Sequence, residues 1–358
     1  MKYSTSAILA LAAATVMTGC GGGGSSSGTS VAQPTQPTPS STVLSGNIAE
    51  DMTLTKDKVW KLDGLVVVTG GATLTIEAGT TIVGLPGTGD ATSYMIIDAG
   101  AKIMAAGTAS EPIIFTSEDT SKREVGQWGG LTIIGNAGNP QVEPYEVNSA
   151  YTAGQGVLND NSGVLKHVKI LNSGITMEQD KEINGLSLVG VGSGTTVENI
   201  TVEYSDDDGI EIWGGTVNLT NVTISHCTDD YFDIDDGYAG TVKNLTINTT
   251  TGNAGIEMSG HTVATFDGFN ITTGATQKKE GAIYFKNAGV GGHFKNGTIT
   301  HNGGQIEAHG AIHSKDIADI ANVSFENVAI ISPAGLQFTG DSKTALETAF
   351  DNGTGNTK

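Results

Sequence analysis

Carboxylates are the most concentrated chemically capable residues of this sequence. Eleven of them lie between positions 203 and 257: Glu203, Asp206, Asp207, Asp208, Glu211, Asp229, Asp230, Asp233, Asp235, Asp236 and Glu257. Carboxylate oxygens are the ligands that calcium prefers, and paired carboxyl groups are also the acid and base of glycoside hydrolysis. The segment therefore indicates cation binding or attack on a sugar linkage. The alternative is a solvated acidic face that keeps the chain soluble.

Aromatic side chains accompany the acidic segment. Trp213 follows an alternating strand pattern and should point outward beside Glu211. Three tyrosines are also close in the sequence: Tyr204, Tyr231 and Tyr238. An exposed aromatic ring next to polar groups can stack on a sugar ring or cap a turn, and both interpretations stay open. Trp213 and Tyr231 are therefore candidate ligand-binding residues.

Short alternating segments must position these side chains. From about residue 45 to 335, apolar and polar residues alternate in short runs separated by Gly, Asn, Asp and Thr, a pattern typical of strands and turns. Equivalent apolar positions follow one another at steps of 24, 22, 24 and 27 residues: Leu186, Ile210, Phe232, Ile256 and Ile283. A second series repeats an asparagine: Asn199, Asn221, Asn244, Asn296 and Asn327. The spacings indicate a repeat of about 23 residues.

A repeat of this length is too short to close a core by itself. Stacked coils, each hydrogen-bonded to the next about 4.8 Å away, would bury one continuous apolar column. The period favours a three-sided parallel β-helix of roughly twelve coils; it is too short for a propeller blade, and the spacing of leucine-rich repeats is absent. The recurring asparagines would occupy equivalent turns, where stacked amides can hydrogen-bond along the column.

The repeat also predicts which carboxylates lie side by side. Alternation buries Ile210 and Ile212, so Glu211 points to solvent, and Asp233 and Glu257 lie above it at about 4.8 Å per coil. Three like charges at that spacing repel unless something neutralises them, and calcium can bridge carboxylates on adjacent coils. The predicted calcium ligands are Asp207, Asp208, Glu211, Asp230, Asp233 and Glu257.

Four histidines suggest a second, weaker metal hypothesis: His293, His301, His309 and His313. If residues 309–313 are extended, His309 and His313 lie about 13 Å apart, too far to share one ion. Pairing between coils stays open.

The repeat and two further segments resemble a known family. The repeat and its asparagine turns look like the right-handed parallel β-helix of the pectin-lyase-like superfamily. Residues 74–80 and 128–137 resemble bacterial surface lipoproteins of that shape. The resemblance covers about 45–335 and implies an all-β fold, a single-stranded right-handed parallel β-helix; it implies the fold rather than an activity.

Part of the acidic segment also resembles the polygalacturonases, whose motifs run Asn-Thr-Asp, Asp-Asp, Gly-His-Gly and Arg-Ile-Lys. Residues 205–210 and 228–232 are similar to the first two in type and order. The resemblance implies that Asp208, Asp229 and Asp230 are the catalytic acid and base and that Lys286 is a ligand-binding cation. Inverting hydrolysis needs carboxyl groups about 6.5–9.5 Å apart, a distance that neighbouring coils can supply.

The sequence departs from that pattern at its two later motifs. Residues 252–255 read Gly-Asn-Ala-Gly where the family's histidine belongs, and residues 284–286 read Tyr-Phe-Lys where its Arg-Ile-Lys belongs. The loss of both the histidine and the arginine puts hydrolytic activity in doubt.

Composition excludes other functions. The chain has 358 residues and a formal net charge of −20, which repels phosphate backbones and excludes nucleic acid as the main partner. Two cysteines are too few for a disulfide-stapled scaffold.

The N-terminal residues predict export and lipidation. Residues 1–19 read as a signal peptide, with Lys2 before an apolar run, residues 7–16, that is too short to span a bilayer. The run ends in Met-Thr-Gly-Cys, which resembles the lipobox of bacterial lipoproteins and implies lipidation of Cys20; an ordinary secretory signal is the alternative. Gly21 resembles the outer-membrane sorting pattern. Attachment to a membrane through lipid on Cys20 is therefore expected, at the outer membrane or the cell surface.

These predictions give a domain plan and two functions. Residues 20–44 carry the lipidated cysteine and a flexible Gly/Ser/Pro/Thr linker, 45–340 form the β-helix, and 341–358 form a C-terminal cap, with one short helix, and a frayed tail. The expected function is that of a cell-surface lipoprotein that displays the β-helix for binding or adhesion to polysaccharide. The alternative is a polysaccharide-degrading glycoside hydrolase that uses acids on adjacent coils.

Overall fold

Residues 38–358 form one compact unit, in which strands repeat along a single axis. The computed structural model describes residues 40–178, 181–249, 251–274, 281–287, 289–303, 309–315, 322–333 and 335–358. The predicted signal peptide, Cys20 and most of the predicted linker lie outside the described residues. No helix in the described part of the chain has the length and apolar character to cross a bilayer.

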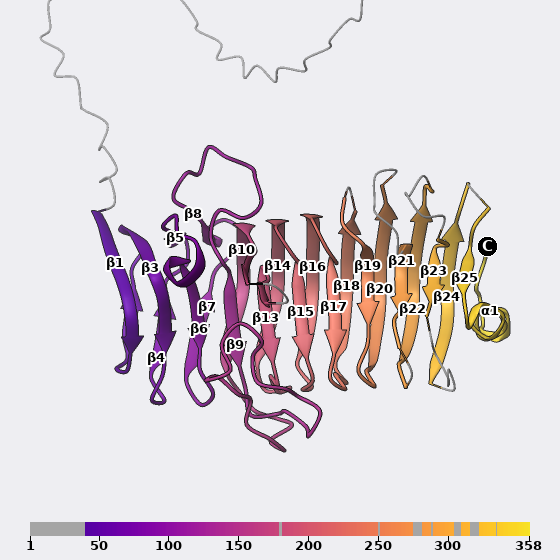
Figure 1. Cartoon of the computed structure of the whole chain (residues 1–358), viewed down its shortest axis with the longest axis horizontal. Helices are drawn as coiled ribbons and strands as arrows, with labels where there is room; N and C mark the ends of the chain where they lie inside the picture. Colours follow the sequence, from indigo (N-terminus) through magenta and orange to yellow (C-terminus); the bar gives the residue numbers. More distant parts are fainter. Residues whose placement is uncertain are drawn as a thin grey trace, which may run out of the picture. The chain divides into compact units, whose positions relative to one another are not determined.

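The first wall of the column, wall 1, consists mainly of short strands (Figure 1). It begins with the C-terminal parts of β1 (Ser40–Ile48) and β3 (Lys58–Val68). The strands that follow are β6 (Tyr94–Ile97), β9 (Leu131–Ile134), β13 (Leu186–Val189), β15 (Ile210–Trp213), β17 (Phe232–Asp235), β19 (Ala254–Met258), β21 (Gly281–Phe285), β23 (Ile312–Ser314) and β25 (Phe338–Gly340). Every neighbouring pair in wall 1 is parallel.

The other two walls are made of separate strands at first and of long bent strands later. Wall 2 starts with β2 (Met52–Leu54), β4 (Thr73–Ile76) and β7 (Lys102–Ala106), and wall 3 with the N-terminal parts of β1 and β3 followed by β5 (Thr81–Gly84) and β8 (Ile113–Ser117). From β10 onward one strand serves both walls. These strands are β10 (Gly163–Ser173), β14 (Thr196–Ser205), β16 (Asn218–Cys227), β18 (Thr241–Asn248), β20 (Val263–Thr273), β22 (Gly291–His301) and β24 (Val323–Ile331).

The asparagine repeat marks the bend in these long strands. Asn199, Asn221 and Asn244 all have a left-handed backbone, with φ near +57°, +57° and +55°, a conformation that asparagine tolerates better than most residues. Their side chains form the predicted ladder: the Asn221 amide donates to Asn199 Oδ1 at 3.0 Å, and the Asn244 amide donates to Asn221 Oδ1 at 2.9 Å. The prediction of stacked asparagine turns is confirmed.

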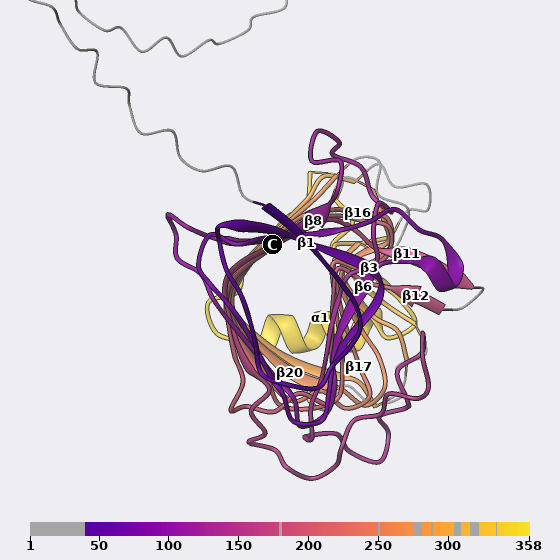
Figure 2. The ribbon, with the colours of Figure 1, turned by 90° about the vertical axis from the view of Figure 1, so that its left-hand side faces the viewer.

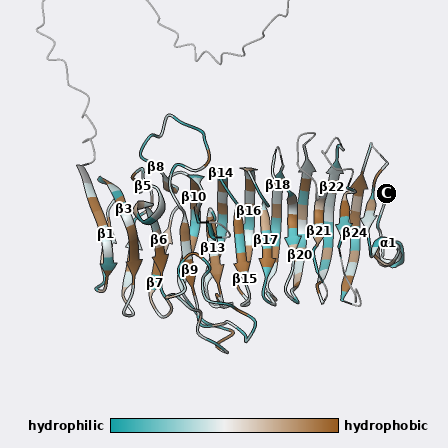
Figure 3. Cartoon of the chain, viewed as in Figure 1, coloured by the Kyte–Doolittle hydropathy of each residue, from teal (hydrophilic) through white to brown (hydrophobic). Residues whose placement is uncertain are grey.

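The fold prediction is also confirmed: the chain is a right-handed parallel β-helix. Among the described residues, eleven rungs follow one another in register along wall 1: Ile48, Val68, Ile97, Ile133, Leu188, Ile212, Ile234, Met258, Phe285, Ser314 and Gly340. The end-on view shows the strands as a ring around one axis (Figure 2), and buried apolar side chains from successive rungs form one continuous core cluster. The hydropathy colouring shows apolar residues recurring on strands along the column (Figure 3).

The start of the column and the C-terminal tail differ from the prediction. β1 begins at Ser40, before the predicted start at residue 45, because its main chain pairs with β3 although its first residues are polar. At the other end α1 (Lys343–Asn352) closes the column with buried Leu346 and Phe350, as predicted. The tail after it is not frayed, since Thr357 donates to the Val328 carbonyl at 2.9 Å.

Two insertions interrupt the repeat next to wall 1. Residues 135–162 lie between β9 and β10 and contain no long strand, and β11 (Ile175–Glu178) pairs antiparallel with β12 (Lys181–Ile183) just before β13. The hairpin, like the short helix η1 (Gly89–Ala91), lies outside the ring of strands (Figure 2). Tyr145 of the first insertion and Ile183 of the hairpin join a second apolar cluster on the outer face of wall 1. The insertions therefore cover part of that face.

Candidate functional site

A cleft of about 640 Å³ lies over the outer face of wall 1, beside the covered part. Its residues are mostly charged: Glu146, Glu182, Asp207, Asp208, Glu211, Asp229, Asp230, Asp233, Asn253, Glu257, Tyr284, Lys286, His309, His313 and Lys315. All six predicted calcium ligands and all three predicted catalytic aspartates line this one cleft. It is the candidate functional site.

The strands place one row of side chains along the floor of the cleft. Glu211 of β15 is in register with Asp233 of β17, which is in register with Glu257 of β19. This is the stacking that the repeat predicts. Glu211, which was expected to point to solvent, is half-buried at the cleft, and the two residues stacked on it are buried, with only 8% of Asp233 and 4% of Glu257 accessible. Tyr284 of β21 continues the row on the next rung.

The turns before these strands supply a second set of carboxylates. Asn184, Asp208 and Asp230 occupy equivalent positions, and each side chain accepts a hydrogen bond from the main chain of the next coil. Asp208 N donates to Asn184 Oδ1 at 3.2 Å, and Asp230 N donates to Asp208 Oδ1 at 2.8 Å. Asp230 Oδ1 in turn accepts from Ala254 N. Asp208 and Asp230 therefore hold adjacent coils together through one carboxylate oxygen each.

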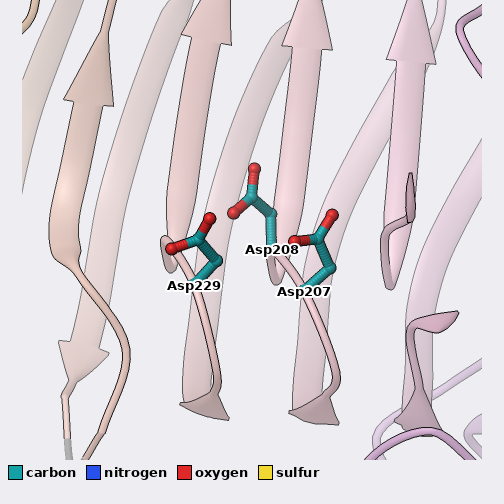
Figure 4. A group of neighbouring side chains, drawn as sticks. All are labelled: Asp207, Asp208 and Asp229. Atoms are coloured by element: carbon teal, nitrogen blue, oxygen red, sulfur yellow. The ribbon is translucent and has the colours of Figure 1, made fainter. Parts of the chain in front are cut away.

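Row and turn carboxylates approach one another in three groups. The groups are Asp207 with Asp208 and Asp229, Asp208 with Glu211 and Asp233, and Asp230 with Asp233 and Glu257. Within each group, one oxygen of every residue lies within 4.8 Å of the others. Figure 4 shows the first group, with Asp207 and Asp208 on one turn and Asp229 on the neighbouring turn. Such clusters could hold a metal ion, and Asp208 and Asp233 each belong to two of them.

Burial and mutual repulsion make these carboxyl groups hard to ionise. Burial first, and then the neighbouring Asp229 and Glu182, raise the pKa of Asp207 to about 8. Burial and repulsion by neighbouring carboxylates also hold the pKa of four further groups well above the usual range: Asp208, Glu211, Asp230 and Asp233. At neutral pH the cluster therefore needs protons or a cation to offset its charge.

Hydrogen bonds satisfy only part of the cluster. Asn184 Nδ2 donates to Glu211 Oε2 at 2.6 Å, and Lys286 forms an ion pair with Glu257. Asp233 lies between these two partners along the row, and its buried Oδ1 has no hydrogen-bond partner among the residues that the structure describes. A buried carboxylate oxygen without a partner is costly, which marks this atom as the best candidate ligand.

Two carboxylates of the cleft could not be predicted from the repeat. Glu146 belongs to the insertion 135–162 and Glu182 to β12, and burial together with Glu182 raises the pKa of Glu146 to about 7. The loss of the 23-residue period between β9 and β13 signals an insertion, but it does not indicate which face the insertion covers.

The two histidines at the other end of the cleft, His309 and His313, lie closer together than the extended arrangement considered for them. The rings of His309 and His313 are stacked with centroids 3.9 Å apart, not about 13 Å. β23 begins only at Ile312, so the chain before it is not extended. The ring of Tyr284 also stacks on that of His313, and the centroids of these two rings are 5.2 Å apart. Burial and the neighbouring His309 lower the pKa of His313 to about 4.

Of the three predicted ligand-binding residues, Lys286 lines the cleft, whereas the aromatic residues Trp213 and Tyr231 do not. Tyr231 is fully buried in the core, so the prediction that its ring stacks on a ligand is wrong. Its hydroxyl instead donates to the Thr251 carbonyl at 3.1 Å. Trp213 does face outward, but Tyr145 packs edge-on against it with ring centroids 6.0 Å apart. The insertion therefore covers part of the Trp213 side chain, which is half-buried.

Comparisons with known proteins agree with this fold. A family model described as a pectate-lyase-like β-helix domain matches residues 46–358. No curated protein matches the chain.

Two solved structures resemble parts of the chain. The enzymatically active domain of tailspike protein 2 from bacteriophage CBA120 is 13% identical with a TM-score of 0.30, and the match covers 79% of this chain and 39% of that one. The full-length tailspike protein 2 from an Escherichia coli O157:H7 bacteriophage is 10% identical with a TM-score of 0.24, covering 79% and 35%. The chain thus spans well under half of either tailspike, and likeness at this level carries no argument about activity. The family model covers most of the chain, and the protein therefore belongs to the pectate-lyase-like β-helix domain family.

Proposed function

We propose that this protein binds polysaccharide at the bacterial surface through divalent cations, calcium above all, held in the acidic cleft. One observation carries the proposal: buried Asp233 belongs to two carboxylate groups at once, and its Oδ1 has no hydrogen-bond partner in the described part of the chain. A cation at this position would supply the missing partner and offset the repulsion along the row.

The donor set fits calcium. Calcium takes 6–8 oxygen ligands at about 2.3–2.6 Å, so two oxygens on one ion lie at most about 5 Å apart. The group of Asp230, Asp233 and Glu257 meets this condition, since its oxygens lie within 4.8 Å of one another. Three protein carboxylates leave further coordination positions for water or for hydroxyl and carboxylate oxygens of a sugar.

The shape and charge of the cleft support a polymeric ligand. The floor follows the axis of the column over successive rungs, from Glu211 through Asp233 and Glu257 to Tyr284 and His313. A chain molecule lying along the axis would meet the carboxylates first and then Lys286 and Lys315. The surface location rests on the sequence alone: the signal-like residues 1–19 and Cys20.

Hydrolysis receives less support than binding. One oxygen of Asp208 and one of Asp229 lie within 4.8 Å of each other, so these two carboxyl groups are closer than the arrangement of an inverting mechanism, in which the groups are about 6.5–9.5 Å apart. Asp208 and Asp230 also each commit one oxygen to the main chain of the next coil.

Calcium titration of three proteins tests the cation. Wild-type protein is expected to melt at a higher temperature in calcium than in chelator, because binding only to the folded state stabilises it. Asp233→Asn should abolish this shift and raise the melting temperature in chelator, because it removes one repelling charge. Asp63→Asn, the same charge change at an exposed site outside the cleft, should leave the calcium shift intact.

A glycan array with and without chelator, followed by reducing-end detection, tests the ligand. Retention of a polysaccharide only in calcium, without new reducing ends, is expected. New reducing ends that disappear in Asp230→Asn would favour the hydrolase, and a melting temperature insensitive to calcium would remove the cation hypothesis.

A further inference from the structure

A second cavity, of about 240 Å³, lies on wall 3 beneath the loop that leads from β8 to β9. Among the described residues it shares no lining side chain with the acidic cleft. Ile114 and Leu171 contribute apolar walls, and Tyr204, Arg123 and Glu203 contribute an aromatic ring and two charges. Mostly apolar cavities with a few placed polar groups are typical of small-molecule sites.

Tyr204 has a backbone conformation that its side chain disfavours. Ser173, Ser205 and Cys227 are in register on successive coils, so the residues before them, Asn172, Tyr204 and His226, occupy one equivalent position. All three have positive φ, near +60°, +64° and +61°. Asparagine tolerates this conformation, whereas a bulky aromatic residue is strained in it, and such strain is concentrated at functional sites.

The strained position presents the tyrosine ring to the cavity. The Tyr204 ring stacks on His226 with centroids 4.4 Å apart and planes 20° apart. His226 lies on β16, the strand that follows β14, and does not line the cavity, whereas the residues that line it come from β5, β8, β10, β14 and the covering loop. His226 therefore covers one face of the ring, which leaves the opposite face as the one that a ligand in the cavity could contact.

The covering loop is fixed to the column, so the cavity is already formed. The buried Asn172 amide donates to the Lys122 carbonyl at 3.0 Å and to Thr116 Oγ1 at 3.4 Å. The loop also brings Arg123, the only arginine of the sequence, within 3.7 Å of Glu203. A planar guanidinium beside a carboxylate presents several donors and acceptors to adjacent hydroxyl groups.

We propose that this cavity binds a single pyranose ring, independently of the cation cleft. An aromatic face next to a planar donor–acceptor pair suits a sugar, which has an apolar C–H face and hydroxyl groups at its rim. At about 240 Å³ the cavity is smaller than the usual range for drug-sized ligands, which favours one ring over an oligomer. The site goes beyond the proposed function, because it needs neither calcium nor the carboxylates of wall 1.

Saturation-transfer NMR in excess chelator tests the site, with the methyl glycosides of glucopyranose, galactopyranose and mannopyranose as probes. At least one glycoside should receive saturation from the wild-type protein. Tyr204→Asn should weaken that binding at least tenfold while the melting temperature stays equal or rises, because asparagine suits the backbone at this position. His261→Asn exchanges another residue of positive φ, +61°, outside the cavity, and should bind as wild type does.

The outcomes separate this site from the cleft. Binding that survives in chelator and in Asp233→Asn but fails in Tyr204→Asn supports it, whatever the fate of the calcium hypothesis. Absence of saturation transfer to all three glycosides, undiminished binding in Tyr204→Asn, or binding that requires calcium would each overturn it.

Discussion

The outer face of wall 1 has two halves that share one geometry and differ in what covers them. One row of side chains runs through both halves, one residue per rung and in continuous register. In the covered half the row consists of Val67, Ile96, Thr132 and Ser187. In the cleft half it consists of Glu211, Asp233, Glu257, Tyr284 and His313.

The covered half behaves as a small second core. Tyr145 of the insertion is buried there, and its hydroxyl lies 3.1 Å from Thr132 Oγ1. Ile96 is fully buried beneath the same insertion although it points away from the column. The part of the insertion around Tyr145 lies at the boundary between the covered half and the cleft half. There Tyr145 packs on Trp213, and the adjacent Glu146 lines the cleft together with the other carboxylates.

The backbone of the column does not by itself determine where a binding site lies. Strand spacing and direction are the same in both halves, so an outward position becomes core or binding site only through its side chain and through what lies above it. The carboxylates of the cleft half line an open cleft, where protons or a cation can offset their mutual repulsion.

The largest expected effect on stability comes from placing a carboxylate in the covered half. Ile96→Asp buries an unpaired charge beneath the insertion, and we expect a loss of more than about 3 kcal/mol of unfolding free energy. Ile96→Val, which removes only one methylene group, should cost about 0.5–1.5 kcal/mol. Chemical denaturation measures both, and equal losses would mean that the insertion does not exclude water from this face.

A pH titration of stability should distinguish the two halves next. Because the folded-state pKa of Asp207 is raised to about 8, the folded protein holds protons that the unfolded chain has already released. The contribution of Asp207 to stability without calcium should therefore be largest below about pH 4, fall as the pH rises, and be lost above about pH 8; each unit of raised pKa corresponds to about 1.4 kcal/mol at most.

Saturating calcium should flatten this profile, because the cation takes the place of the protons. The measurement is urea denaturation at several pH values with chelator or calcium. A profile that rises from pH 5 to 8 in chelator would contradict the assignment of buried, mutually repelling carboxyl groups.

The smallest expected effect on stability comes from Glu146, at the boundary between the covered half and the cleft half. Glu146 has a pKa of about 7, so at pH 5.5 it is already protonated and Glu146→Gln should change little. At pH 8.5 the same substitution removes a charge and should stabilise the protein by on the order of 1 kcal/mol. Glu143→Gln, in the same insertion but outside the cleft lining, serves as the control. A gain that is equal at both pH values would place Glu146 outside the charged cluster.

The repeat was sufficient to predict the column and one row of its site. Spacings between Ile210, Phe232 and Ile256 fixed the register, and the register brought Glu211, Asp233 and Glu257 together as the structure has them. The asparagine ladder followed from the same reasoning. These features depend on the number of residues per coil, which is a local property that a sequence displays directly.

Burial and the surroundings of the site were not predictable in the same way. Nothing in the pattern around Glu146 or Glu182 indicates that these residues reach the carboxylates, and the buried ring of Tyr231 has the sequence context of an exposed one. The stacked pair of His309 and His313 depends on a bend before β23 that no periodicity reports.

The amino-acid sequence thus determined the coil length, the register and the identity of the stacked carboxylates, because each rung repeats a short-range pattern of inward and outward residues. Only the tertiary structure decided which outward residues are core, which line a cleft, and how far their pKa values rise. Those properties depend on insertions that fold back from distant positions, and the free energy of a buried charge is set by everything packed around it.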